Sequence, residues 1–175
     1  MKLLKHKLIY KNKFGYKLWH DILQIEGRRV FYDYLERTND YVVIVPRDSK
    51  GYLYFVKHYR YAIKKTILEL PVGYVDKNES PRVAAKRELH EEIGAKSASF
   101  KYLGYIWQIP GIFKLKCHIF FADNILTNGK PLDSDENLKV IKVKENKINS
   151  LIAKGKIEDS SSVVALARYG LDTNP

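Results

Sequence analysis

The sequence predicts one α/β domain in which helices pack on a mixed β-sheet. The 175 residues suit a single core, since a chain of about 150 residues buries roughly 70% of the surface that its unfolded form exposes. The composition, 45% hydrophobic and 29% charged, is ordinary for a globular protein. Strand-like and helix-like segments are also intermixed along the chain, which favours layers of helix and sheet.

The first part of the chain predicts strands. It is rich in tyrosine, valine, isoleucine and phenylalanine, and turn-forming stretches interrupt it at residues 12–15, 26–28 and 38–40. We therefore assign residues 1–38 to an N-terminal β extension and residues 39–175 to the main domain.

A hairpin should follow this extension. Residues 41–46 and 52–58 have strand composition, and the Asp48 to Gly51 stretch between them supplies turn residues. The main domain should therefore begin with two neighbouring antiparallel strands.

Residues 81–93 predict a helix of nearly four turns. Ser80 suits the N-cap, Pro81 the first helical position and Gly94 the left-handed C-terminal position. Apolar residues repeat every four positions and form a stripe that can pack on a sheet: Ala85, Leu89 and Ile93.

The last part of the chain alternates between strand and helix patterns. We expect strands over residues 99–107, 117–126 and 138–143, and a loop over residues 127–136. Helices should span residues 148–156 and 160–171.

Three glutamates of the predicted helix lie on one side. Glu88, Glu91 and Glu92 stand at positions i, i+3 and i+4, so their like charges repel by a few tenths of a kcal/mol per pair. A divalent cation between them would remove that repulsion, and oxygen-only ligands indicate magnesium or manganese. A solvated acidic face is the alternative for three such glutamates taken alone.

The residues around these glutamates carry a longer motif. From Gly73 the chain reads GYVDKNESPRVAAKRELHEEIGA. This resembles the Nudix box, G-x5-E-x7-R-E-U-x-E-E-x-G-U, where U is a bulky apolar residue. Only Ala95, at the last position, is smaller than usual. Seven such matches would coincide by chance on the order of once in 10⁸ windows.

The Nudix resemblance implies a fold and a metal site. The fold would be an α/β/α sandwich around a mixed sheet. Glu88 and Glu92 would be the principal magnesium ligands, Glu91 would assist, and the backbone carbonyl of Val72 would complete the site. Arg87 would orient a glutamate. The reaction implied is metal-dependent hydrolysis of a pyrophosphate without a covalent intermediate.

Similarity outside the box indicates a subgroup. The stretch KHYRYAIKKTILELPVGYVD resembles the segment before the box in ADP-ribose and nucleotide-sugar pyrophosphatases, where Arg60 would contact substrate. Pro110 and Gly111 resemble a proline-containing turn of that group, and Arg37 a second substrate arginine. Trp19 could stack on a base or belong to the core.

The general base is less defined. The stretch DSDENLKVIKV resembles the loop that supplies a catalytic glutamate in related enzymes, which makes Glu136 the candidate. Asp133, Asp135 and Glu92 remain alternatives. Lys114 and Lys116 stand where many relatives have acidic or small polar residues, so they would either bind a more anionic ligand or be solvated.

We therefore expect a magnesium-dependent hydrolase of ADP-ribose or a related nucleoside diphosphate sugar. The net charge of +11 suits an anionic substrate but does not select one. Six lysines among the first seventeen residues keep an RNA 5′-pyrophosphate or cap hydrolase as an alternative. A nucleotide sensor without catalysis is a further alternative.

Location and assembly follow from weaker features. The single cysteine, Cys117, fits packing in a reducing compartment. The N-terminus has no continuous apolar segment of the kind found in secretory signals, and no apolar stretch approaches the roughly 20 residues of a membrane helix. We expect a cytoplasmic protein. The family resemblance implies a homodimer built by the N-terminal extension.

Overall fold

The computed structural model describes residues 1–131 and 138–173. Its strands are β1 (Lys2–Lys11), β2 (Tyr16–Ile25), β3 (Arg28–Arg37), β4 (Tyr41–Pro46), β5 (Tyr52–Arg60), β6 (Lys65–Glu69), β7 (Val72–Tyr74), β8 (Ala95–Lys96), β9 (Ser99–Ile109), β10 (Phe113–Asp123), β11 (Leu126–Thr127) and β12 (Lys139–Lys144). Its helices are α1 (Pro81–Ile93), α2 (Ile148–Ala153) and α3 (Ser160–Thr173), with 3-10 turns η1 (Tyr61–Ile63) and η2 (Glu145–Lys147).

Two sheets form the centre of the fold. The larger sheet has the order β1-β2-β3-β10-β4-β7, with β9 also paired to β10, and the smaller one has the order β12-β5-β6. Strand β10 runs parallel to β4 and antiparallel to β9. The sheet is therefore mixed, as predicted.

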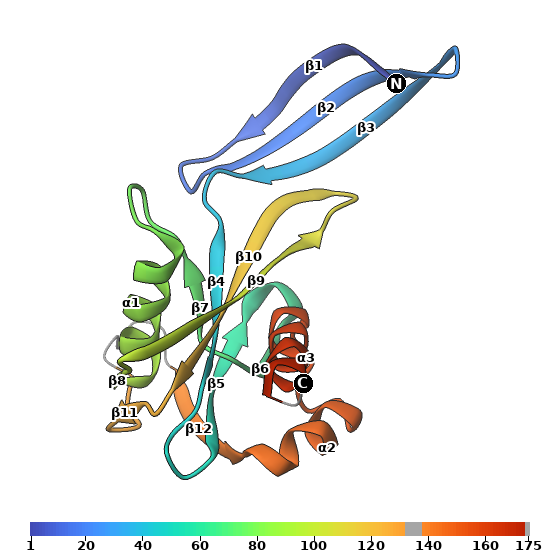
Figure 1. The fold of residues 1–175 in the computed structure, drawn as a ribbon. Coiled ribbons are helices and arrows are strands. Elements are labelled where there is room, and N and C mark those ends of the chain that lie inside the picture. Colours follow the sequence, from blue (N-terminus) through green and yellow to red (C-terminus); the bar gives the residue numbers. More distant parts are fainter. Residues whose placement is uncertain (132–137, 174–175) are drawn as a thin grey trace.

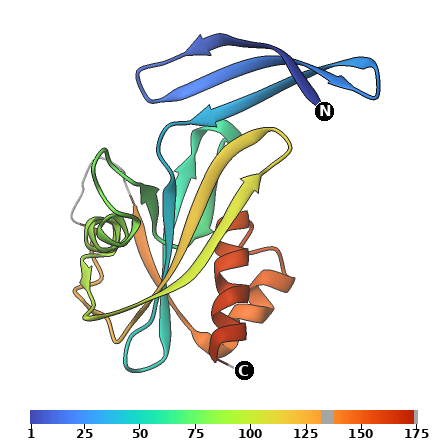
Figure 2. The same ribbon diagram turned by 45° about the horizontal axis from the view of Figure 1, so that its top comes forward.

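Strand β4 separates two core layers. Val42 and Ile44 pack in one cluster with Leu89 of α1, whereas Val43 and Val45 pack in the other with α2 and α3. Because side chains of a strand alternate between faces, successive residues of this one buried strand contribute to the two layers in turn. Figure 1 and Figure 2 show α1 and α3 on opposite sides of the sheets. The predicted α/β/α sandwich is confirmed.

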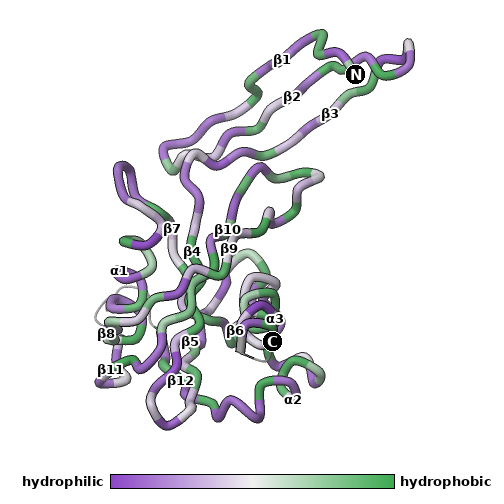
Figure 3. Tube along the Cα trace, viewed as in Figure 1, coloured by the Kyte–Doolittle hydropathy of each residue, from purple (hydrophilic) through white to green (hydrophobic). Residues whose placement is uncertain are grey.

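The first three strands extend away from this body as an arm, which we define as β1, β2 and β3 (Figure 1). All ten residues of β1 are exposed. Figure 3 shows hydrophilic and hydrophobic residues intermixed along the arm. Its strand character is as predicted, but the division of the chain into residues 1–38 and 39–175 stays a prediction.

The end signals of α1 act as predicted. The Ser80 side chain accepts a hydrogen bond from the backbone N–H of Val83, and Gly94 adopts φ 60° while its N–H bonds to His90. Strand β4 also has its predicted bounds.

Several predicted boundaries were wrong. Strand β10 begins at Phe113 rather than residue 117, and β5 and β9 extend to Arg60 and Ile109 rather than residues 58 and 107. Strand β10 ends at Asp123 rather than residue 126, because Asn124 turns the chain with φ 49° and Leu126 pairs with Lys96 in a separate ladder. Helix α2 ends at Ala153 rather than residue 156, because the chain turns at Gly155 with φ 61°.

Candidate active site

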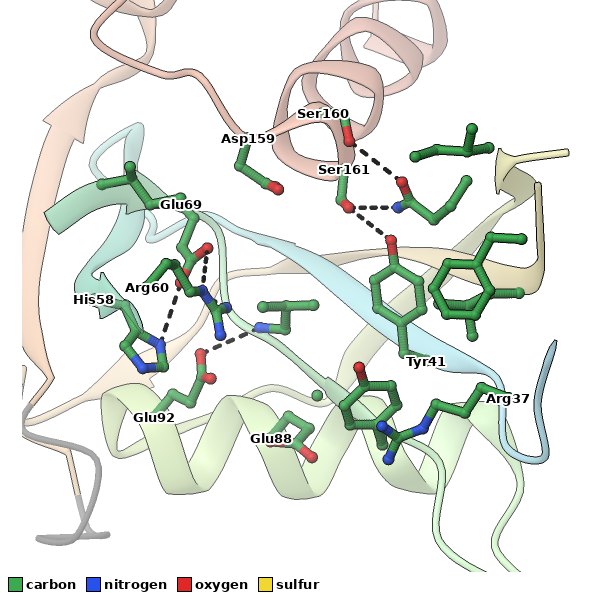
Figure 4. A pocket seen from close by; sticks show the side chains of 18 of the residues that line it. Arg37, Tyr41, His58, Arg60, Glu69, Glu88, Glu92, Asp159, Ser160 and Ser161 are labelled. Carbon is green, nitrogen blue, oxygen red and sulfur yellow. Dashed lines mark hydrogen bonds and ion pairs between the residues drawn. The ribbon is translucent and has the colours of Figure 1, made fainter. Parts of the chain in front are cut away.

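A cavity of about 710 Å³ opens where α1, β5, β6, β7, the β9–β10 hairpin and the start of α3 meet. That volume lies within the range of sites that hold nucleotide-sized ligands. Figure 4 shows the side chains of α1 on one side of it and those from the start of α3 on the other.

Two glutamates of α1 form the floor of the cavity. Glu88 and Glu92, one turn apart, are 9% and 5% exposed and line it. The backbone N–H of Val72 donates to Glu92 Oε2 at 3.2 Å. Glu91 is outside the lining and its side chain is 41% exposed. The structure therefore brings Glu88, Glu92 and Val72 together and leaves Glu91 at the edge.

Gly73 allows the chain before the helix to approach Glu88. A Cβ atom at Gly73 would lie 1.9 Å from Glu88 Cδ and 2.0 Å from Glu88 Oε1. Only glycine leaves room for that carboxylate where it now lies. The first glycine of the motif thus leaves space for the carboxylate of a glutamate fifteen residues later.

Arg87 connects the motif's carboxylates. Its Nε and Nη2 donate to the two oxygens of Glu79 at 3.1 and 3.0 Å, and its Nη1 donates to Glu88 at 2.6 Å and Glu91 at 2.9 Å. Nη2 also donates to the carbonyl of Tyr74 at 2.8 Å. Hydrogen bonding to Arg87 lowers the pKa of Glu79, and the same contact raises the pKa of the guanidinium. Arg87 therefore holds two carboxylates of the helix in defined orientations.

The donor set fits a hard divalent cation. Glu88 and Glu92 supply buried oxygen ligands, which magnesium and manganese prefer. In the part of the chain that the structure describes, no three histidine, cysteine, aspartate or glutamate side chains converge on one point. Glu136, Asp133 and Asp135 lie outside the described residues. The fit therefore rests on two glutamates and the chain at Val72.

Arg60 lines the cavity and is held by a buried carboxylate. Its Nε donates to Glu69 Oε2 at 3.2 Å, its Nη2 forms an ion pair with Glu69 Oε1 at 2.7 Å, and Glu69 is 1% exposed. His58 Nδ1 lies 3.3 Å from Glu69 without hydrogen-bonding geometry. Burial, with Arg60 nearby, lowers the pKa of His58. The predicted substrate arginine therefore has a fixed direction (Figure 4).

Arg37 also lines the cavity, stacked between two tyrosines. Its guanidinium carbon lies 3.1 Å from the ring centre of Tyr74 and 4.7 Å from that of Tyr16. The two tyrosine hydroxyls are hydrogen-bonded at 2.9 Å, and burial raises the pKa of Tyr74 to about 12. Such stacking favours a fixed cation at this edge of the cavity.

Other predicted residues lie elsewhere. Pro110 borders a separate small pocket, and the carbonyl of Gly111 accepts a hydrogen bond from Tyr32 of the arm. Trp19 stacks on His6 and donates to Glu36 at 2.7 Å. None of these three predicted residues lines the described cavity.

Lys114 and Lys116 of β10 also lie outside the lining. Lys114 pairs with Glu36 at 2.8 Å, and Lys116 lies over Tyr105 and Trp107. These partners favour the solvated alternative over the phosphate-binding one.

The sequence analysis missed several lining residues: His58, Glu69, Gln108, Asp159, Ser160 and Ser161. Glu69 had a local signal, since it is a lone charge between apolar Leu68 and Leu70. The others had none, because distant segments bring them together.

Comparisons with known proteins identify the family of the chain. The family model for the NUDIX domain matches residues 37–166. The chain is 30% identical over 127 residues to the methanol dehydrogenase activator of Bacillus methanolicus, covering 71% of this chain and 69% of that protein. It is 28% identical to the ADP-ribose pyrophosphatase of Bacillus subtilis, with the same coverage.

Two further proteins match almost the whole chain, one in sequence and one in structure. The GDP-mannose pyrophosphatase of Escherichia coli is 24% identical over 179 residues, which cover 94% of this chain and 92% of that protein. A crystal structure of an ADP compounds hydrolase superposes with a TM-score of 0.86 at 22% identity, covering 97% and 92%. The chain belongs to the Nudix family of pyrophosphohydrolases. Within that family its matches include several ADP-ribose pyrophosphatases, as the motifs predicted.

Proposed function

We propose that this enzyme hydrolyses the pyrophosphate bond of ADP-ribose or a related nucleoside diphosphate sugar in the presence of magnesium or manganese. The products would be a nucleoside monophosphate and a sugar phosphate. The observation that carries the proposal is the pair of buried carboxylates, Glu88 and Glu92, on the floor of a nucleotide-sized cavity that Arg37 and Arg60 also line.

Each residue has a role that its contacts support. Glu88, Glu92 and the carbonyl of Val72 would hold the metal, with Glu91 assisting from the edge. Bound magnesium would neutralise phosphate charge and lower the pKa of a coordinated water. Arg87 fixes the direction of Glu88 through its 2.6 Å contact.

The substrate-binding residues are the two arginines of the cavity. Arg60, fixed by Glu69, would bind a phosphate, since a guanidinium matches phosphate oxygens in geometry and charge. Arg37 would contact the nucleoside. The general base stays a choice among Glu136, Asp133, Asp135 and Glu92.

We also propose that two copies form a homodimer through the arm. Large apolar side chains on the arm are exposed, among them Phe31 at 66% and Ile9 at 50%, and exposed apolar patches favour association. Pro110 and Gly111 lie beside the arm. In such a dimer they would contact the substrate bound to the partner copy. No helix in the described chain is long and apolar enough to cross a membrane, and a cytoplasmic location stays a prediction.

A substrate panel tests the proposed function. The purified protein with magnesium should convert ADP-ribose, GDP-mannose or another member of the panel to a nucleoside monophosphate and a sugar phosphate, and EDTA should abolish this. Glu92→Gln should lower kcat by at least about 10²-fold. Glu91→Gln, outside the cavity lining, should lower it by about tenfold or less. Near-normal turnover of Glu92→Gln would refute the assignment.

A further inference from the structure

The cavity has a second wall that differs chemically from the metal floor. The start of α3 and the end of β9 contribute four polar residues to it, which we call the polar wall: Gln108, Asp159, Ser160 and Ser161. Figure 4 shows this wall across the cavity from Glu88 and Glu92. Among the described residues, β9, β10 and α3 give the cavity no lysine or arginine.

Hydrogen bonds fix most of the polar wall. Ser161 Oγ accepts from Gln108 Nε2 at 2.6 Å and is bonded to the Tyr41 hydroxyl at 2.7 Å. Ser160 Oγ donates to Gln108 Oε1 at 3.2 Å. The Gln108 amide is thereby oriented, with oxygen toward Ser160 and nitrogen toward Ser161. The wall is built before any ligand arrives, which lowers the entropy cost of binding.

Asp159 gives this wall a negative charge. Its Oδ2 accepts from the backbone N–H and the hydroxyl of Ser162 at 2.7 and 2.8 Å. Among the described residues, none donates to Oδ1. The start of a helix ordinarily attracts anions, but here the aspartate already caps the helix and supplies its own charge. A further phosphate would be repelled at this wall, whereas hydroxyl groups can donate to the carboxylate.

We infer that the polar wall binds the hydroxyl groups of an uncharged sugar on the far side of the pyrophosphate, and that Asp159 selects this sugar over a terminal phosphate. The inference rests on the proposed function and assigns the residues that recognise the sugar of its substrate. Asp159 and Ser160 would accept and donate hydrogen bonds to sugar hydroxyls, while Ile109 and Leu115 beside them supply apolar surface for the sugar carbons.

Asp159→Asn tests the inference with little risk to the fold, because asparagine caps helices as well as aspartate does. Kcat/KM for ADP-ribose divided by that for ATP should fall by about tenfold or more, the scale of a lost hydrogen bond to a charged group. Glu158→Gln is the matched control, since this neighbouring carboxylate is outside the cavity lining and pairs with Lys65 at 2.7 Å. It should change the ratio by less than about twofold.

Calorimetry provides a readout that needs no turnover. Asp159→Asn should weaken ribose 5-phosphate binding by about tenfold and leave AMP and GMP binding within about twofold. If Asp159→Asn does not fold, Ser160→Ala, which leaves the cap intact, should still weaken ribose 5-phosphate by about two- to fivefold. Unchanged sugar phosphate binding in the folded variant would overturn the inference, and so would a loss confined to GMP, which would mean that the carboxylate binds a base.

The same measurements separate this inference from the proposed function. If ribose 5-phosphate binds in an Asp159-dependent way but no panel substrate is hydrolysed, the proposed function fails and the polar wall stands as a sugar site. If ADP-ribose is hydrolysed normally and Asp159→Asn changes neither readout, the function stands and the inference is wrong.

Discussion

Strands β4 and β1 belong to the same sheet, yet their environments are opposite. All six residues of β4 are buried, whereas all ten of β1 are exposed. Both strands contain large apolar side chains. The difference is coverage, since α1 and α3 pack on the two faces of β4 (Figure 1) and no described element packs on the arm in this way.

This comparison shows where the stability of the chain resides. The arm is held by strand pairing and by contacts between neighbouring strands, such as His6–Asp21 at 2.7 Å and His20–Asp33 at 2.6 Å. Cross-strand pairs of this kind contribute roughly 0.2–1 kcal/mol each. The body is held by buried apolar area, which contributes far more per residue. Substitutions in the arm should therefore cost less stability than substitutions in the body.

The largest expected effect compares one leucine from each region. Leu89 of α1 is 1% exposed and Leu8 of the arm is 41% exposed. Leu89→Ala should lower the free energy of unfolding by about 2–5 kcal/mol, because it leaves a cavity in a packed layer. Leu8→Ala should cost less than about 1 kcal/mol. Urea unfolding measures both, and equal losses would contradict the comparison.

A second pair of variants compares glycines. Gly73→Ala should lower kcat by about 10²-fold, since its Cβ would displace the Glu88 carboxylate. The melting temperature should change little, because a side-chain end can move at small cost. Gly170→Ala, in α3 and outside the cavity lining, is the control, as a Cβ there meets nothing within 4 Å. If Gly73→Ala is active, the close approach to Glu88 is not needed for catalysis.

A substitution in the arm should change the assembly of the protein rather than its folding. Phe31→Glu, at a side chain 66% exposed, should shift the protein from dimer to monomer in sedimentation experiments, with at least about a tenfold rise in the dimer dissociation constant. Leu171→Glu, at a leucine 76% exposed on α3, should leave the dimer intact. A monomeric wild-type protein would exclude the proposed dimer.

The smallest expected effect is a loss of stability at acid pH. The pKa of His58 is lowered in the fold, so the unfolded chain binds its proton more readily. The contribution of His58 to the free energy of unfolding is then fully present above the pKa of histidine in the unfolded chain, about 6.5, and is lost as the pH drops below it. The free energy of unfolding should be lower at pH 5.5 than at pH 7.5, and His58→Gln should reduce this difference. Denaturant unfolding at both pH values measures this difference.

Features set by interactions within one segment could be predicted from the sequence, whereas features set by contacts between distant segments could not. The bounds of β4 and α1 were predicted because a buried apolar run and a Ser80-to-Gly94 capping pattern act within one segment. The motif also indicated which face of α1 carries the chemistry. The arm's exposure was not predictable, because strand composition does not reveal whether another element covers the strand.

The sequence by itself determined the family, the α/β layers and the side of α1 on which Glu88 and Glu92 lie, since fixed spacing on one helix sets these. Tertiary structure alone decided that Glu69 holds Arg60, that Gly73 makes room for Glu88 and that Asp159 faces the cavity. Such contacts depend on how separate segments dock, and docking is set by packing that no local pattern records.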